Sequence, residues 1–239
     1  MSLMRSDKSY KTHEKQLLFL SSCFLQSSEI MLYYSLRMIF NVEGDLFKMS
    51  HQEGKNAIEK NIMNRRTIKS FKEDPVNPEE IIELLNVAKW APNHKLTQPW
   101  RFQMYTGEGK EVFAQAYIDA QPTVEGEVSE KALRKAQYYK DIPIQLVIIM
   151  PEDPRQRTWD EDYGAVSAFI QNFQLAAWER GLGMIWRTND WVYNPIFREG
   201  IGVKPGEKIV ATMMIGYPKH VPTAKERTDI RESLTIIDR

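Results

Sequence analysis

The apolar residues of this chain fall into a regular pattern from residue 56 onward, and the pattern predicts helices separated by short strands. The strongest helical signal covers 160–180 and stops at Gly181, a residue type that often follows a helix end. Its expected buried face recurs at helical spacing in Val166, Phe169, Ile170, Phe173 and Ala177. Shorter helices are expected over 56–64, 110–120 and 128–140.

A further helix has a clear start signal at Asn77. Asparagine is a favoured N-cap residue, Pro78 suits the first helical position, and Glu80 suits the third. This helix is expected to end before Pro92. Its broad apolar face consists of Ile81, Ile82, Leu84, Leu85 and Ala88.

Strands are expected between these helices, over 99–105, 145–150, 184–187 and 208–215. Gly107 and Gly109 mark a turn after the first strand, and Pro143 and Pro151 bound the largely apolar second strand. Because the strands are few and helices separate them, the pattern favours one α+β domain with a central sheet and helices around it.

The first 55 residues do not follow this pattern and are expected to form an N-terminal extension. Polar and charged residues interrupt the apolar stretch from Leu17 to Phe40, so neither a secretory signal nor a membrane span is expected. Cys23 follows a short stretch that resembles a lipoprotein cleavage box, but the apolar run before it is too short. A packed or poorly ordered extension and a natural start at Met49 are the alternatives.

Charge and composition restrict the class of protein. The 32 Lys and Arg residues are balanced by 32 Asp and Glu, and the pI is about 6.9, so no nucleic-acid partner is expected. With 42% hydrophobic and 27% charged residues, the chain has the composition of an ordinary globular protein. A single cysteine excludes an intramolecular disulfide and favours a reduced, cytoplasmic setting.

Several kinds of catalytic site lack their sequence signals. The chain contains no Gly-x-Ser-x-Gly elbow, no Walker loop and no Gly-x-Gly-x-x-Gly motif. No two of its four histidines have the spacing of metal ligands on a helix, so no metal site is expected.

The most informative polar cluster is the run from Arg65 to Lys69. Arg65, Arg66 and Lys69 supply three cations, and Thr67 supplies a hydroxyl. These groups together can bind a phosphate, because arginine offers a planar fork of donors and lysine a point charge. The alternative is a solvated basic turn.

Two more clusters are candidates for ligand contact. The loop over 93–100, which contains His94, follows a helix and enters a strand. Alternatively, this loop is only a turn, whose polar side chains form hydrogen bonds with nearby backbone groups. The third cluster, Trp186-Arg187-Thr188, ends a strand, where the arginine either faces a ligand at the sheet edge or pairs with a surface acid.

In their order and spacing, these clusters resemble the nitroreductase family of FMN-dependent oxidoreductases, over about residues 60–220. The matching segments are NRRTIKSF at 64–71, APNHK at 91–95, QPWRF at 98–102, GMIWRTN at 183–189 and IGYP at 215–218. The APNHK segment is similar to that of the small branch with an Ala-Pro-Asp/Asn-His-Lys motif. The resemblance assigns residues 56–239 to one nitroreductase-like domain.

The resemblance implies an intertwined homodimer with a central, mostly antiparallel sheet and two FMN sites at the interface. Arg65, Arg66 and Thr67 would bind the FMN phosphate and ribityl chain, with Lys69 nearby. Thr67 stands where the family more often has serine and keeps the hydroxyl, whereas Lys69 replaces a frequent arginine and loses the bidentate geometry.

Other site residues implied by the resemblance come from the two remaining clusters. His94 and Trp90 would reach the flavin of the other subunit. Trp186, Arg187 and Thr188 would flank the isoalloxazine ring from the first subunit.

The implied activity is transfer of a hydride from NADH or NADPH through FMN to an oxidised acceptor, such as a nitroaromatic or a quinone, in a ping-pong cycle. No catalytic side chain is implied, since the flavin performs the chemistry. The alternatives are another flavin enzyme on the same fold, such as a dehalogenase or a flavin reductase, and a non-catalytic FMN-binding protein. The physiological acceptor and the nucleotide preference do not follow from the sequence.

Overall fold

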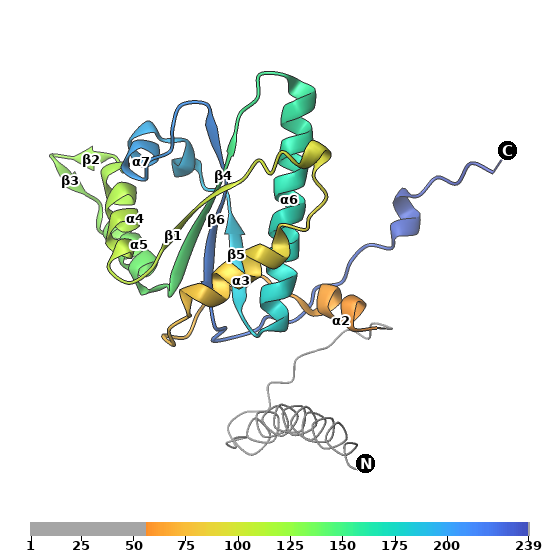
Figure 1. Cartoon of the computed structure of the whole chain (residues 1–239). Coiled ribbons are helices and arrows are strands. Elements are labelled where there is room, and N and C mark those ends of the chain that lie inside the picture. The colour runs from red at the N-terminus through yellow and green to blue at the C-terminus, as the bar shows by residue number, and fades with distance from the viewer. Residues whose placement is uncertain (1–55, 239) are drawn as a thin grey trace, which may run out of the picture. The chain divides into compact units, whose positions relative to one another are not determined.

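The computed structural model describes residues 56–238, and Figure 1 shows how their helices and strands are arranged. The expectations about the first 55 residues, including Cys23, lie outside the described residues. The helices are α2 (Ala57–Asn64), α3 (Pro78–Ala88), α4 (Gly109–Asp119), α5 (Glu130–Asp141), α6 (Gln156–Glu179) and α7 (Pro195–Gly200). The strands are β1 (Arg101–Tyr105), β2 (Thr123–Val124), β3 (Glu127–Val128), β4 (Ile144–Pro151), β5 (Gly183–Arg187) and β6 (Glu207–Gly216). Short 3₁₀ helices are η1 (His94–Leu96), η2 (Asp190–Tyr193) and η3 (Ile230–Ser233). None of the helices within 56–238 is long and apolar enough to cross a membrane.

The central sheet has the strand order β1-β4-β6-β5, and every neighbouring pair is antiparallel. This confirms the predicted antiparallel sheet and its four strands. The central strand β4 is buried from Ile144 to Met150, in agreement with its apolar sequence. Because β5 is an edge strand, one side of it is open to other segments of the chain.

Helices cover both faces of this sheet and complete the predicted α+β architecture. Figure 1 shows α4, α5 and α7 on one face, and α3 and α6 on the other. Adjacent residues of β6 point to opposite faces, so Met214 packs with Phe113 whereas Met213 packs with Phe169 and Phe173. The sheet therefore lies between two hydrophobic cores, one on each of its faces.

Helix α3 starts as predicted at its asparagine cap. The side chain of Asn77 accepts a hydrogen bond of 3.0 Å from the backbone N–H of Glu79, and Pro78 occupies the first turn. The buried face is narrower than expected: Ile81, Leu84 and Ala88 are buried, whereas Ile82 is 40% exposed.

Two features of the connections differ from the prediction. Helix α6 starts at Gln156, four residues before the expected 160, and ends before Gly181 with its positive φ of 79°. The sequence pattern does not predict the hairpin β2–β3, and Val128 of β3 falls within the helix expected over 128–140, which starts instead at Glu130 after its cap Ser129. Such two-residue strands are too short to show an alternating pattern.

The segment after α2 adds to the open edge of β5. Thr67 forms a parallel bridge with Met184, and the N–H of Ile68 donates to the carbonyl of Met184 at 3.1 Å. Further along, Phe71 pairs in antiparallel fashion with Pro218. The basic run that begins at Arg65 is thereby attached to the sheet by its backbone.

This attachment requires glycine at position 183. A Cβ added to Gly183 would meet the Ile68 side chain, with its Cβ at 2.8 Å, and would lie 2.9 Å from Cγ of Pro218. We therefore expect Gly183→Ala to lower the free energy of unfolding by about 1–3 kcal/mol, as overpacking of a tight site usually does. Denaturant unfolding of the full chain measures this change.

The matched control is Gly164→Ala, in the middle of α6. No heavy atom lies within 4 Å of the Cβ that alanine would add there, so the better helix propensity should raise the free energy of unfolding by about 0.5–1 kcal/mol. Equal stabilisation by both substitutions would contradict the close packing of Ile68 on β5.

Candidate functional site

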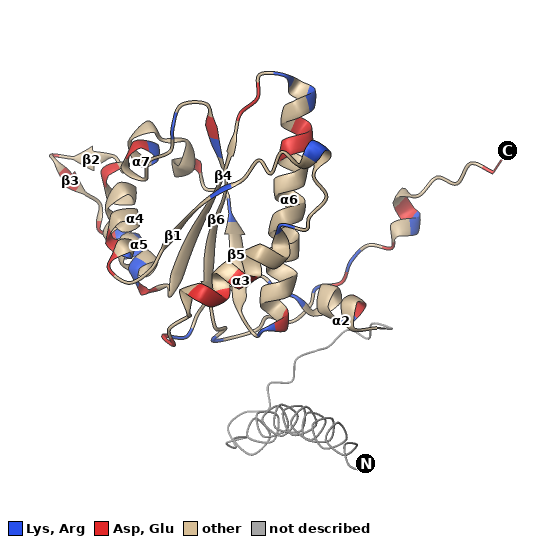
Figure 2. Cartoon of the chain, viewed as in Figure 1, with Lys and Arg blue, Asp and Glu red and all other residues tan. Residues whose placement is uncertain are grey.

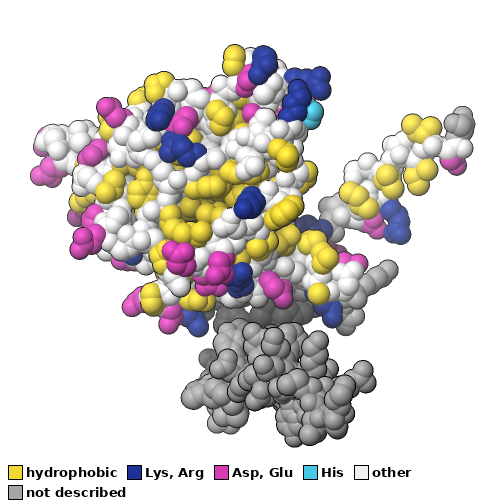
Figure 3. Space-filling view, in the orientation of Figure 1, with side chains coloured by type: hydrophobic (Ala, Val, Ile, Leu, Met, Phe, Trp, Pro, Cys, Tyr) yellow, Lys and Arg dark blue, Asp and Glu magenta, His cyan; other side chains and the backbone are white. Residues whose placement is uncertain are grey.

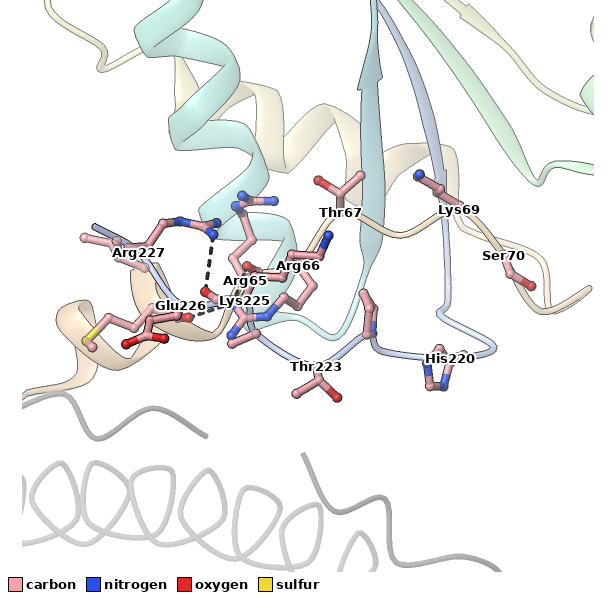
Figure 4. A pocket seen from close by; sticks show the side chains of 14 residues that line it. Arg65, Arg66, Thr67, Lys69, Ser70, His220, Thr223, Lys225, Glu226 and Arg227 are labelled. Atoms are coloured by element: carbon pink, nitrogen blue, oxygen red, sulfur yellow. Dashed lines mark hydrogen bonds between the residues drawn. The ribbon is translucent and has the colours of Figure 1, made fainter. Parts of the chain in front are cut away.

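A cavity of about 870 Å³ lies between the end of α2, the segment after it and the chain that follows β6. Figure 4 shows the side chains that line it, which come from two stretches far apart in the sequence. The first stretch contributes Ile62, Met63, Arg65, Arg66, Thr67, Lys69 and Ser70; the second contributes His220, Pro222, Thr223, Ala224, Lys225, Glu226 and Arg227.

Three arginine side chains give this cavity a concentrated positive charge. Burial lowers the pKa of Arg65, and the charges of Arg66 and Arg227 lower it further. The pKa of Arg66 is lowered by burial and by Arg227. Within residues 56–238, none of the three forms an ion pair with a carboxylate. Mutual repulsion without compensation makes the cavity a favourable place for an anion.

The guanidinium groups also have hydrogen-bonding capacity that the protein leaves unused. Nε of Arg65 is buried and has no hydrogen-bond partner among the described residues. A buried donor without a partner is costly, so a ligand with acceptor oxygens would relieve this cost. Elsewhere, positive and negative residues are interspersed along the helices in the view of Figure 2.

Local contacts hold the basic run in place. Asn61 donates from its side chain to the carbonyl of Leu175 at 3.0 Å, which ties α2 to α6. Nη1 of Arg66 donates to the carbonyls of Met63 at 2.7 Å and of Arg65 at 2.9 Å. One nitrogen of Arg66 is therefore used to fix the end of α2, which orients the remainder of its guanidinium.

The two stretches that line the cavity are joined by backbone hydrogen bonds. The N–H of Lys219 donates to Ser70 at 3.0 Å, and the N–H of Lys72 donates to Tyr217 at 2.8 Å. Thr67 and Lys69 are exposed, and Figure 4 shows them further along this segment than the arginines. The cavity thus continues from the arginines past Thr67 to Lys69.

The loop with His94 lies outside this cavity. His94 is exposed, and its Nε2 lies 4.0 Å from a carboxylate oxygen of Glu161 on α6. Trp90, in the turn after α3, is 84% exposed and does not line the cavity either. In the described chain, neither residue is brought to the arginine cluster.

The shape of this loop is held by a chain of polar contacts. Asn93 donates to the hydroxyl of Thr97 at 3.0 Å, and that hydroxyl donates to the buried carboxylate of Asp162 at 3.2 Å. The loop needs such support because Lys95 and Gln98 have left-handed backbone angles, with φ of 55° and 47°.

The third cluster is divided between the two faces of the sheet. The indole N–H of Trp186 donates to the carbonyl of Val210 at 3.1 Å, and its ring packs with the core on the α3 and α6 side. Arg187 lies beside tyrosines of α5 on the other face, and Thr188 is exposed after the strand. These residues do not line the cavity of the arginine cluster.

The chain after β6 contributes cavity residues that the sequence analysis did not find. Lys225 and Arg227 line the cavity opposite Arg65 and Arg66, and the Arg227 guanidinium donates to the carbonyl of Lys225 at 3.3 Å. The available signal was a second basic stretch soon after the last strand. No spacing rule connected it with a run more than 150 residues earlier.

The order of these elements and the basic run that lies beside β5 agree with a known family. A family model described as the nitroreductase family matches residues 62–217. This chain belongs to the nitroreductase family. The matched range includes the first stretch of the nitroreductase cavity and ends before the second.

Similar proteins cover most of this nitroreductase. A Bacillus subtilis protein named "Putative NAD(P)H nitroreductase YfhC" is 35% identical over 73% of the chain and 91% of its own length. The crystal structure of a nitroreductase-like family protein from Bacillus cereus is 41% identical, with a TM-score of 0.73, and covers 79% of this chain and all of its own. The FMN-dependent nitroreductase NfnB from Mycobacterium smegmatis, solved in complex with NADPH, has a TM-score of 0.58. It covers 75% of this chain and 97% of its own, but at 17% identity it shows the fold alone.

The described part of the chain contains no group of three or more His, Cys, Asp and Glu side chains arranged to bind a metal ion. The cavity is lined by arginine and lysine side chains and by the hydroxyls of Thr67, Ser70 and Thr223, with Glu226 as the one acidic residue among the lining residues, and such a set suits a phosphorylated ligand.

Proposed function

We propose that this nitroreductase is an FMN-dependent enzyme that uses NADH or NADPH to reduce an oxidised acceptor, such as a nitroaromatic or a quinone. Bound FMN would supply the hydride-transfer chemistry. The observation that carries the proposal is the cluster of Arg65, Arg66 and Arg227, which has positive charge and a free donor but no carboxylate partner within 56–238. The relative from Bacillus subtilis, which is named as an NAD(P)H nitroreductase, supports it.

The arginine cluster fits the phosphate end of FMN. Arg65, Arg66 and Arg227 would bind the phosphate oxygens, and the hydroxyl of Thr67 would bind the phosphate or the ribityl chain. The backbone of this segment is fixed to β5, so the donors are positioned before the ligand arrives.

The ring end of FMN would lie toward Lys69 and the end of β5. The positive charges of Lys69 and Arg187 would stabilise the negative charge that reduction adds to the ring. Thr188 is exposed beside them and would offer a hydroxyl. The indole of Trp186 is hydrogen-bonded to the carbonyl of Val210 in the core. Trp186 would therefore contribute to the flavin site through its position in β5.

The complete site would be formed by a homodimer with shared FMN sites. Two observations support this. Trp90 and His94, which the family resemblance places at the flavin, do not line the cavity of their own chain. Figure 1 shows that the chain after β6 extends from the domain, and Figure 3 shows hydrophobic side chains on this segment. The large hydrophobic residues exposed there are Ile230, Leu234, Ile236 and Ile237. Exposed apolar residues in such a number are typical of a surface that binds another protein.

We predict that Arg65→Ala and Arg66→Ala each weaken FMN binding about tenfold to a hundredfold. A hydrogen bond to a charged group is typically worth about 1.5–3 kcal/mol, which corresponds to this range of affinities. The measurement is titration of the flavin-free protein with FMN, followed by flavin fluorescence. Arg134→Ala is the control, because Arg134 forms an exposed ion pair with Glu130 on α5. Unchanged affinity in both variants would refute the phosphate assignment.

We predict that His94 acts across the dimer interface. The variants Arg66→Ala and His94→Ala should each be inactive alone, and should be denatured and refolded together. In a mixed dimer with shared sites, one site carries both substitutions and the other carries neither. Random pairing makes half of the dimers mixed, so activity should return to roughly a quarter of the parent value.

The control for this experiment is each variant refolded by itself, which must give an inactive dimer. If the mixture of such dimers stays inactive, Arg66 and His94 belong to the same chain's site. An active His94→Ala variant would show instead that His94 is not needed.

We predict that deletion of residues 1–48 leaves a folded dimer that binds FMN. The described elements begin with α2, whose helix is capped at Asn56, and the family match begins at residue 62. Size-exclusion chromatography and flavin absorbance of the truncated protein test this. A truncation that is insoluble or free of flavin would show that the extension packs on the core or across the dimer.

A further inference from the structure

The loop over residues 93–98 has an unusual backbone. Lys95, Leu96 and Gln98 all adopt left-handed angles, with φ of 55°, 53° and 47°. Such angles are disfavoured for any residue with a Cβ, because the side chain crowds the backbone. A strained backbone persists only where its surroundings hold it, and strain of this kind is concentrated at functional sites. The 93–98 loop therefore needs a support, and the residue that supplies it is a candidate for a functional role.

A buried side chain of α6 is linked to this loop by a path of hydrogen bonds. Asp162 is 8% exposed, and its Oδ1 accepts a hydrogen bond of 3.2 Å from the hydroxyl of Thr97. That hydroxyl accepts in turn from the side-chain amide of Asn93 at 3.0 Å. Oδ1 of the same Asn93 accepts from the backbone N–H of Gln98 at 2.6 Å. The path thus leads from the helix to one of the strained residues of the 93–98 loop.

The carboxylate of Asp162 has no opposite charge beside it. Within residues 56–238, it forms no ion pair with a lysine, arginine or histidine. Burial of an unpaired charge is costly to the folded protein. The packing of α6 therefore gives no reason for an aspartate at this position, whereas the hydrogen bond to Thr97 does.

The preceding residue of α6, Glu161, also contacts the 93–98 loop, but more weakly. One of its carboxylate oxygens lies 4.0 Å from Nε2 of His94, and the other accepts from Nε of Arg157 at 3.0 Å. Both side chains of the Glu161–His94 pair are partly exposed, and ion pairs of this kind contribute little to stability. The buried contact of Asp162 is therefore the stronger link between α6 and the loop.

We propose that Asp162 is a positioning residue for His94. Through Thr97 and Asn93 it fixes the 93–98 loop in its left-handed conformation, so the imidazole is held in place before a second chain binds. A loop fixed in advance loses less conformational freedom when the shared site forms. This inference deepens the proposed function and rests on it, because the proposed site places His94 at the flavin of the other subunit.

Hydrogen exchange of the full-length protein tests the support without reference to activity. The backbone N–H of Gln98 should exchange about tenfold faster in Asp162→Ala, the lower end expected when a hydrogen bond to a charged group is lost. Mass spectrometry of peptides that span the 93–98 loop measures this rate. Asp160→Ala, at an exposed position of the same helix, is the matched control and should leave the exchange of the loop unchanged.

Substitutions at the exposed Thr97 test the same hydrogen bond without altering the packing of α6. Thr97→Val keeps the size of the side chain but removes the hydroxyl, so it should accelerate exchange as much as Asp162→Ala does. Thr97→Ser keeps the hydroxyl and should preserve slow exchange. Thr97→Val combined with Asp162→Ala should have little further effect, because both remove one hydrogen bond. Slow exchange in both single variants, Asp162→Ala and Thr97→Val, would overturn the inference.

The reduction potential of bound FMN connects this support to His94. His94→Ala should shift the potential, and Asp162→Ala should shift it in the same direction. In the His94→Ala background, Asp162→Ala should cause no further shift. A shift that persists there would overturn the inference, since Asp162 would then act on the flavin without His94.

The two measurements also separate this inference from the proposed function. If the wild-type protein binds no FMN but its loop exchanges faster in Asp162→Ala and Thr97→Val, the proposed function fails and the support of the 93–98 loop by Asp162 stands. If the protein binds FMN and reduces an acceptor while neither variant changes the exchange of the loop or the potential, the proposed function stands and the inference fails.

Discussion

The close packing of Ile68 on Gly183 sets the position of the whole candidate site. Because residue 183 has no side chain, the segment after α2 can form its bridge to Met184 and hydrogen-bond to an edge strand. Gly216, near the end of β6, has a similar role, since a Cβ there would lie 3.0 Å from the Phe71 ring. Two small residues at one end of the sheet thus fix both ends of the segment that carries the basic run. Because the sheet already holds the basic run in place, the run loses little conformational freedom when a ligand binds.

The sequence predicts the elements better than it predicts the site. Long periodic helices, the Asn77 cap and the apolar strand β4 follow from local patterns, because each depends on neighbours within a few residues. The run from Arg65 to Lys69 was also recognisable as a phosphate-binding candidate. Arg227 is not recognisable in this way, because only folding brings it close to Arg65. A contact between residues so far apart in the chain leaves no periodic pattern in the sequence.

The arginine cluster of the cavity holds positive charges that destabilise the folded protein but favour the binding of an anionic ligand. Like charges without partners and buried donors without acceptors each reduce the stability of the protein before a ligand binds. The two cores of the domain, with the fully buried Phe113 and Phe169 on opposite faces of the sheet, tolerate this cost. Binding of an anion would remove the repulsion, so the bound protein should be more stable than the free one by an amount that follows ligand concentration.

The alternation of side chains along β5 divides the roles at its end. Trp186 points to one face and is committed to the carbonyl of Val210, whereas Arg187 points to the other and meets helix α5. Within the strand, Trp186 and Arg187 therefore cannot both direct their side chains to the same face of the sheet. Of these two side chains, it is Arg187 that lies beside Tyr138 and Tyr139 of α5. Tyr138 of this helix donates to the backbone carbonyl of Lys69, so one tyrosine links α5 to the segment that carries the basic run.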